Sequence, residues 1–515
     1  MKALAVLLVM ACAGTATAQP GPAPSAIEPS FSQPLAAAVF TSAFGFIAPR
    51  TLDPVTVPQL AIWGLRGLTA LDPALVPELR EDSIRLSTSD RLVFNGPIPS
   101  DQSPASWGEL AATVAQAAAV QSDAVRRAGT RGVVRSFFDE LFNHLDPYSR
   151  YEPPGAANTE REHRSGQAGL GMQVASRGGQ IVAASVTPDS PADDAGVRAG
   201  DPIVAVDGRT TRGQTAATVA GWIAGAEDTV VRLAWRGRGG RSRSEAITRA
   251  LVAPETVVAE RIGAILVIRI AAFSRSTDEQ FASALTVGLG GRSRVAGVVV
   301  DLRGNRGGLL RQAVAVVDQV VEGGVVAVTA GRNPQASRTW PGGNGPDQAG
   351  GRPMIVLVDG RSASAAEIMA AALADSRRAV VVGSSTLGKG LVQTIAPLPD
   401  GGELFVTWSR VLAPLGWPIQ GLGVLPQVCT SLGQEAVERQ VSGLMAGQQD
   451  MKAALQRHRA ARAPLPPAQI VALRSACPAA EGRDLDLDVA NFLLDHPPAY
   501  RAGLIDPGLL SAAKP

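Results

Sequence analysis

Residues 354–373 read MIVLVDGRSASAAEIMAAAL. The apolar run Met354–Val358 predicts a buried strand, and the alanine-rich end of the stretch predicts a helix. Ser362 and Ser364 stand at the turn between them. Backbone N–H groups converge at such a turn and the helix dipole is positive there, which suits the stabilisation of an oxyanion. The residues from Ser364 to Glu367 also match a helix capping box, so local sequence alone favours a plain N-cap over a nucleophile.

The residues around this stretch, 255–430, alternate strand and helix patterns, which predicts an α/β fold. The expected strands are Ile265–Ile270, Val295–Val300, Val325–Val328, Met354–Val358, Ala379–Val382 and Leu404–Trp408, and the expected helices are Asp278–Leu285, Leu309–Val321 and Ala365–Ala374.

Lys389 is unusual because only four of the 48 basic residues are lysines, and it lies between two glycines. All four histidines lie outside residues 255–430, so that segment has no histidine for a Ser-His-Asp triad. A buried Lys can lose its proton, whereas Arg stays charged. An ordinary Lys has a pKa of about 10.4, and action near neutral pH needs a value lower by roughly three. Gln393 would share a strand face with Lys389 and could orient its amine.

A glycine-rich loop, DLRGNRGG at residues 301–308, follows the expected strand Val295–Val300. Paired glycines after a strand let backbone amides approach a ligand closely. Because a helix is expected to follow, this loop also suits an oxyanion.

Residues 166–251 change to short strands with glycine-rich turns. The segments GLGM (169–172), SPADDAGVRAGD (190–201) and IVAVDG (203–208) resemble a PDZ domain of the bacterial protease type. The resemblance implies that Gly169, Leu170, Gly171 and Met172 bind the C-terminal carboxylate of a substrate peptide. The peptide then adds as a strand, and a pocket selects an apolar last residue. The alternative is a structural β module with an empty groove.

Four further motifs resemble the tail-specific, or C-terminal processing, serine peptidases. They are VVVDLRGNRGG (298–308), RSASAAEIMAAAL (361–373), GSSTLGKGLVQT (383–394) and IQGLGVLP (419–426). In that family a PDZ domain precedes an α/β peptidase core of the crotonase/ClpP-like type. Its Ser and Lys stand 25 positions apart, as Ser364 and Lys389 do here, which selects Ser364 over Ser362.

The same resemblance implies a role for each matching residue. Ser364 is the expected nucleophile, Lys389 the general base and Gln393 its orienting partner. The oxyanion hole is expected at the backbone N–H of Ala365 and of a glycine of the 304–308 loop, Gly307 or Gly308. Two positions depart from the family pattern: Arg306 stands where Pro is common, and Gln427 stands where Asp is common.

The N-terminus predicts export. Met1 and Lys2 precede an apolar run at residues 3–11, and Ala16-Thr17-Ala18 matches a cleavage site, so residues 1–18 have the layout of a signal peptide. The expected location is the periplasm, with a lipid anchor at Cys12 as the alternative. No later segment is apolar for long enough to span a bilayer. In an oxidising compartment Cys429 and Cys477 could pair.

The 515 residues, 45% of them hydrophobic, predict several folded domains, and the net charge of +2 argues against a nucleic-acid partner. The predicted division is a signal peptide (1–18), a linker (19–35), a mainly helical region (36–165), a PDZ domain (166–251), a Ser-Lys peptidase core (252–430) and a helical C-terminal extension (431–515).

The predicted function is that of a secreted serine endopeptidase acting on proteins or peptides with apolar C-termini. It needs no metal or cofactor, and a homo-oligomer or an adaptor protein stays open as a further partner. The alternative is an inactive PDZ-containing protein that only binds exposed C-termini. A small-molecule enzyme of the crotonase-like fold is disfavoured by the PDZ domain.

Overall fold

The structure is a computed structural model that describes residues 30–237, 239–291 and 294–505. The predicted signal peptide, with Cys12, lies outside the described residues. The linker predicted for 19–35 ends earlier than expected, because helix α1 begins at Gln33. Pro34 in its first turn has no N–H to leave unpaired, which allows the helix to start there.

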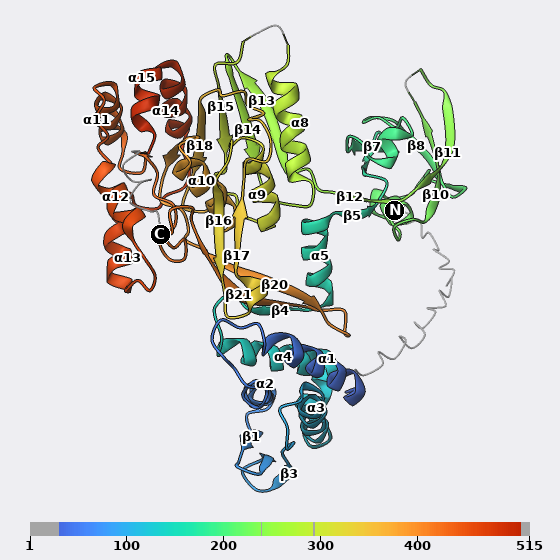
Figure 1. Ribbon diagram of the computed structural model, residues 1–515. Coiled ribbons are helices and arrows are strands. Elements are labelled where there is room, and N and C mark those ends of the chain that lie inside the picture. The colour runs from blue at the N-terminus through green and yellow to red at the C-terminus, as the bar shows by residue number, and fades with distance from the viewer. Residues whose placement is uncertain (1–29, 238, 292–293, 506–515) are drawn as a thin grey trace, which may run out of the picture.

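The N-terminal region is a bundle of four helices with a small antiparallel sheet beside it (Figure 1). Aromatic side chains fill its core: the rings of Phe40 and Phe137 stack with their centroids 4.0 Å apart, and Phe138 packs edge-on against Phe137. The elements are α1 (Gln33–Ile47), α2 (Val57–Leu71), β1 (Val76–Leu79), β2 (Ser83–Ser87), β3 (Leu92–Pro97), α3 (Pro104–Gln121) and α4 (Asp123–Asn143).

The next module stands beside the rest of the molecule and has its own core around Leu170 and Trp235 (Figure 1). The strands that enter and leave it, β5 and β12, pair with each other and form its base. Its elements are β5 (Gln167–Gly169), β6 (Met172–Arg177), β7 (Gln180–Val186), α6 (Pro191–Asp194), β8 (Ile203–Val206), β9 (Arg209–Thr210), α7 (Ala216–Ile223), β10 (Val230–Arg236), β11 (Ser242–Thr248) and β12 (Ala250–Val252).

A six-stranded sheet of order β13-β14-β15-β18-β19-β22 forms the centre of the α/β part. Its strands run parallel except for β13, which lies antiparallel at one edge. The strands are β13 (Val257–Ile262), β14 (Ile265–Ile270), β15 (Gly297–Asp301), β18 (Met354–Val358), β19 (Val380–Gly383) and β22 (Val428–Cys429). The chain is therefore a mixed α/β protein, as the sequence predicts.

Both faces of this sheet are covered by helices. Helices α8 (Thr277–Leu289), α9 (Leu310–Asp318) and α10 (Ala365–Asp375) pack on one face. The C-terminal helices α11 (Gln434–Met445), α14 (Asp484–Asp495) and α15 (Pro497–Gly503) pack on the other, and α12 (Lys452–Ala460) and α13 (Pro467–Arg474) lie near them (Figure 1). The residues after 430 thus complete the α/β layer structure.

A second sheet joins the α/β part to the helical bundle. It holds β16 (Val325–Ala330), β17 (Arg338–Pro341), β20 (Leu391–Pro397) and β21 (Glu403–Leu412), and β4 (Arg150–Glu152) pairs with β21. A short 3-10 helix, η1 (Pro334–Ala336), precedes β17, and α5 (Pro154–Ser165) follows β4. Within the described ranges no helix is long and apolar enough to span a bilayer.

Candidate active site

Three loops leave the carboxyl ends of adjacent parallel strands and meet at one edge of the central sheet. They follow β15, β18 and β19, which lie side by side in the sheet. We call them the glycine loop (302–309), the serine loop (359–364) and the lysine loop (384–390). Ligand sites in open α/β sheets form at this edge.

Ser364 ends the serine loop in a conformation that a non-glycine residue rarely adopts. Its φ of 56° and ψ of −117° place it outside the common regions, directly before helix α10. Such a backbone costs on the order of 1–3 kcal/mol and persists only where the surroundings impose it. The half-buried side chain lines a cleft of about 650 Å³. The turn therefore presents this hydroxyl to a space that a substrate can enter.

Ser362 differs from Ser364 in burial and in hydrogen bonding. It is fully buried, and its hydroxyl donates to the Leu302 carbonyl oxygen at 2.8 Å and accepts from the Asp359 N–H at 3.0 Å. The first bond holds the serine loop against the glycine loop and the second closes the serine loop on itself, so Ser362 has a structural role.

A buried carboxylate joins the serine loop to the lysine loop. The N–H groups of Ser364 and Lys389 both donate to Glu367 Oε2, each at 2.8 Å. The Gly388 N–H donates to Glu367 Oε1 at 2.6 Å, and the Thr386 hydroxyl donates to the same oxygen. Burial raises the pKa of the Glu367 carboxyl above its usual range, and these four hydrogen bonds oppose that rise. One side chain therefore fixes the separation of the two backbones.

The amine of Lys389 lies in the same cleft, above the ring of Tyr148, with Nζ 5.0 Å from the ring centroid. Burial lowers the pKa of the Lys389 amine below that of an ordinary lysine, and the positive charge of Arg150 lowers it further. The carboxylates of Glu367, Asp146 and Glu160 oppose this change. The environment therefore shifts Lys389 toward the neutral form that a base needs.

Gln393 lines the cleft, but no hydrogen bond between it and Lys389 occurs among the described residues. Its Nε2 instead donates to Thr407 Oγ1 at 3.2 Å, and the Thr407 hydroxyl donates to Asp146 Oδ1 at 2.6 Å. Asp146 and Tyr148 are parts of the site that no sequence motif indicated. An Asp-Pro pair after a helix reads equally well as a helix end, so only the fold reveals that this turn reaches the amine.

The candidate oxyanion donors differ in availability. The Gly307 N–H donates to Asn305 Oδ1 at 2.7 Å, so it is already engaged. Within the described chain the N–H groups of Gly308 and Ala365 have no hydrogen-bond acceptor. Gly307 still has a steric reason to be glycine, because an added Cβ at its φ of +99° would lie 2.8 Å from the Ser364 Cβ. The geometry favours Gly308 and Ala365 as the donating pair.

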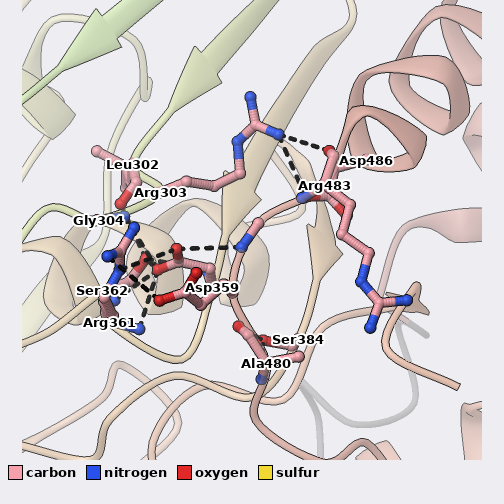
Figure 2. Close-up of polar contacts among 12 residues, drawn as sticks. Leu302, Arg303, Gly304, Asp359, Arg361, Ser362, Ser384, Ala480, Arg483 and Asp486 are labelled. Atoms are coloured by element: carbon pink, nitrogen blue, oxygen red, sulfur yellow. Dashed lines mark hydrogen bonds and ion pairs between the residues drawn. The ribbon is translucent and has the colours of Figure 1, made fainter.

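A C-terminal segment, residues 477–486, touches all three loops, and we call it the C-terminal clamp. Gly360 of the serine loop donates its N–H to the Ala480 carbonyl at 2.7 Å, and Ser384 Oγ of the lysine loop donates to the same oxygen at 2.9 Å. Arg303 of the glycine loop forms an ion pair with Asp486 at 3.2 Å (Figure 2). The Cys429–Cys477 disulfide ties the clamp to β22.

Gln427 and Arg306, the two residues that depart from the family pattern, lie in different surroundings. Gln427 is buried and binds β19, accepting from the Val381 N–H at 3.0 Å, so it acts as part of the sheet. Arg306 is exposed and lines the cleft. A larger cavity of about 820 Å³ lies between the 187–191 loop and α8, and neither Ser364 nor Lys389 lines it.

The predicted peptide-binding loop, Gly169 to Met172, connects β5 to β6. Leu170 is buried in the core of its module, and Gly171 has a φ of +72° that brings it against Ser190. Among the described strands β6 pairs only with β7, so its other edge is open, and helix α7 lies beside it. An open strand edge next to a helix is the arrangement to which an extended peptide adds.

Comparisons with known proteins agree with the site. Residues 264–430 match the model of peptidase family S41, and residues 182–237 match that of the PDZ domain. The carboxy-terminal-processing protease of Bartonella bacilliformis is 35% identical over 300 residues, which cover 58% of this chain and 69% of the relative. The chain belongs to peptidase family S41. The resemblance seen in the sequence is thereby confirmed, and the protein is a serine-type peptidase.

A second relative and a solved structure are also described as C-terminal processing enzymes. The chloroplastic C-terminal processing peptidase of Tetradesmus obliquus is 31% identical over 351 residues, covering 61% of this chain and 74% of the relative. A solved structure, titled photosystem II D1 C-terminal processing protease, is 29% identical and covers 75% of this chain and 97% of its own, with a TM-score of 0.35.

Proposed function

We propose that this peptidase is an exported endopeptidase that cleaves peptide bonds with a Ser364–Lys389 dyad. Ser364 Oγ attacks the substrate carbonyl and Lys389 Nζ takes its proton. The N–H groups of Ala365 and Gly308 stabilise the tetrahedral oxyanion. Lys389 then returns the proton to the leaving amine, and water hydrolyses the acyl-enzyme. The observation that carries this proposal is the shared carboxylate, because Ser364 and Lys389 donate their N–H groups to one oxygen of Glu367.

In this proposal Gln393 orients the lysine indirectly. Its amide is held by Thr407, which is held in turn by Asp146 of the turn that carries Tyr148. The chain of contacts therefore ends at the ring beneath the amine.

The PDZ domain is proposed to select substrates by their C-termini. The Gly169–Met172 loop binds the terminal carboxylate, and the open edge of β6 takes up the peptide beside α7. The proposed selectivity is for an apolar last residue. Amidation of the C-terminus should then slow cleavage of an otherwise identical protein substrate.

The remaining expectations also belong to this proposal. They are a cleaved signal peptide at residues 1–18, a periplasmic location, the six-part division of the chain and a peptidase core of the crotonase/ClpP-like type. The disulfide is consistent with an oxidising compartment.

The test is cleavage of an unstructured protein with an apolar C-terminus. The parent should cleave it, Ser364→Ala should not, and Ser362→Ala should keep a folded protein with partial activity because its hydroxyl binds only the loops. Thermal melting of each variant separates loss of chemistry from loss of folding. Binding of the substrate without cleavage by the folded parent would favour the inactive PDZ-containing binding protein.

A further inference from the structure

The cleft beside Ser364 is strongly cationic although the whole chain is nearly neutral. The chain carries a formal net charge of +2. One carboxylate, Glu160, lines the cleft, whereas the arginines that line it are Arg150, Arg164, Arg275, Arg306, Arg311 and Arg338. A cleft lined by charges of one sign concentrates ligands of the opposite sign.

Two of these arginines are already neutralised by protein carboxylates. Arg150 binds Glu152 at 2.6 Å, and Arg164 binds Glu403 at 2.7 Å. Glu160 in turn lies 3.9 Å from Arg164. Among the described residues that line the cleft, the one acidic side chain therefore faces a cation that has a closer partner.

The other four arginines have no ion pair with any carboxylate of the described residues. Arg275, Arg306 and Arg311 are exposed, and Arg338 is exposed with its guanidinium stacked 4.3 Å from the centre of the Trp340 ring. They come from four different parts of the fold: the loop before α8, the glycine loop, the first turn of α9 and strand β17. Separate parts of the fold thus bring unpaired guanidinium groups to one cleft.

We propose that the cleft recognises substrate carboxylates next to the scissile bond, so that the peptidase prefers acidic segments at the point of cleavage. This inference rests on the proposed function, because it assigns selectivity to the same cleft. A guanidinium offers a planar pair of donors that matches a carboxylate, so arginine suits this role better than lysine. Arg306 adds a positive charge to the cleft at a position where the family commonly has Pro, which carries none.

The carboxylate can come from two sources. It can be an Asp or Glu side chain within the substrate segment, or the chain terminus itself when the bond cleaved lies close to the substrate's end. Both present the same group to the arginines. Comparison of an internal Glu with Gln, and of a free C-terminus with an amide, distinguishes them.

The experiment measures kcat/KM for short peptides of one sequence that differ only beside the scissile bond. Glu-containing, Gln-containing and Lys-containing peptides are each made as the acid and as the amide. We expect cleavage to favour Glu over Gln by about tenfold at low salt, and Gln over Lys by a similar factor. The preference should fall as salt rises, because exposed charges are screened.

Variants locate the effect. The Arg311→Gln/Arg338→Gln double variant should lose most of the acidic preference while it still cleaves the Gln peptide. Arg439→Gln, which removes an exposed arginine of α11 outside the cleft, is the matched control and should retain the preference. A preference for the free acid alone that disappears in the double variant would assign the carboxylate to the chain terminus. Equal rates for all peptides, or a preference that persists in the double variant, would overturn the inference.

A binding measurement separates this inference from the proposed chemistry. Fluorescence anisotropy of labelled peptides on Ser364→Ala reports recognition without cleavage. Tighter binding of the Glu peptide that depends on Arg311 and Arg338 supports the inference even if no peptide is cleaved. Conversely, cleavage that survives in Ser364→Ala would refute the dyad and leave the charge preference measurable in the same peptides.

Discussion

The disulfide between Cys429 and Cys477 should control both stability and activity, because it fixes the C-terminal clamp to the central sheet. The two residues lie 48 positions apart. In the chain-entropy model, a cross-link across a loop of this length contributes about 4 kcal/mol to the free energy of unfolding. Both cysteines are completely buried, so Ala is a better replacement than Ser, whose hydroxyl would be buried without a designed partner. We therefore expect Cys429→Ala/Cys477→Ala to lose up to this amount.

The loss should extend to catalysis because the clamp contacts every loop of the site. When the clamp loosens, Gly360 and Ser384 lose a shared acceptor at Ala480, and Arg303 loses Asp486. We expect kcat for a short reporter peptide to fall more than KM rises, because the loops position reacting groups rather than bind the peptide. The assay pairs urea unfolding with steady-state kinetics.

Reductant supplies the control for this prediction. It should shift the parent protein toward the double variant and leave the double variant unchanged. If the double variant kept the same urea midpoint and the same kcat as the parent, the clamp would have no part in positioning the loops, and the reasoning would fail.

Three further predictions concern the dyad and its supports. Lys389→Arg should reduce kcat by at least about 10²-fold in steady-state kinetics, because Arg cannot accept a proton. Since only the neutral amine of Lys389 accepts a proton, a pH–rate profile of the parent should rise through its lowered pKa and level off below the usual lysine range. Gly307→Ala should retain the fold by circular dichroism and lose activity, because its new methyl would lie 2.8 Å from the Ser364 Cβ. Glu367→Gln should destabilise the protein by about 2–6 kcal/mol in urea unfolding, because the amide NH₂ would face two of the four donors that the carboxylate now accepts.

The sequence was sufficient to predict the α/β class, and it nominated Ser364 and Lys389 as candidate catalytic residues, which remain predictions. The continuous apolar runs of β15, β18 and β19 are typical of parallel strands covered on both faces, and in the fold every residue of these strands is buried. Lys389 stood out because the chain uses Arg almost everywhere else. The choice of Ser364 over Ser362 depended on family spacing, and the structure supplies a physical reason in the buried, bonded hydroxyl of Ser362.

The supports of the site could not be predicted because they depend on contacts between distant segments. Glu367 looked like a capping-box residue, and in the fold it does accept from the Ser364 N–H. Its larger role arises from the lysine loop, more than 20 positions later, which no local pattern announces. Asp146 reaches Thr407 across 261 positions in the same way.

The C-terminal extension shows most clearly why position in the chain is a poor guide to function. The sequence of this extension contains no motif that points to a catalytic or binding role. Yet its Cys477 forms a disulfide with Cys429 of the edge strand β22, and this bond holds the clamp beside the loops that carry Ser364 and Lys389. A carboxyl-edge site is built from loops that leave their strands in one direction, so nothing within the sheet restrains their far sides. The clamp supplies that restraint through Ala480 and Asp486, so residues 477–486 help to position the loops that carry Ser364 and Lys389.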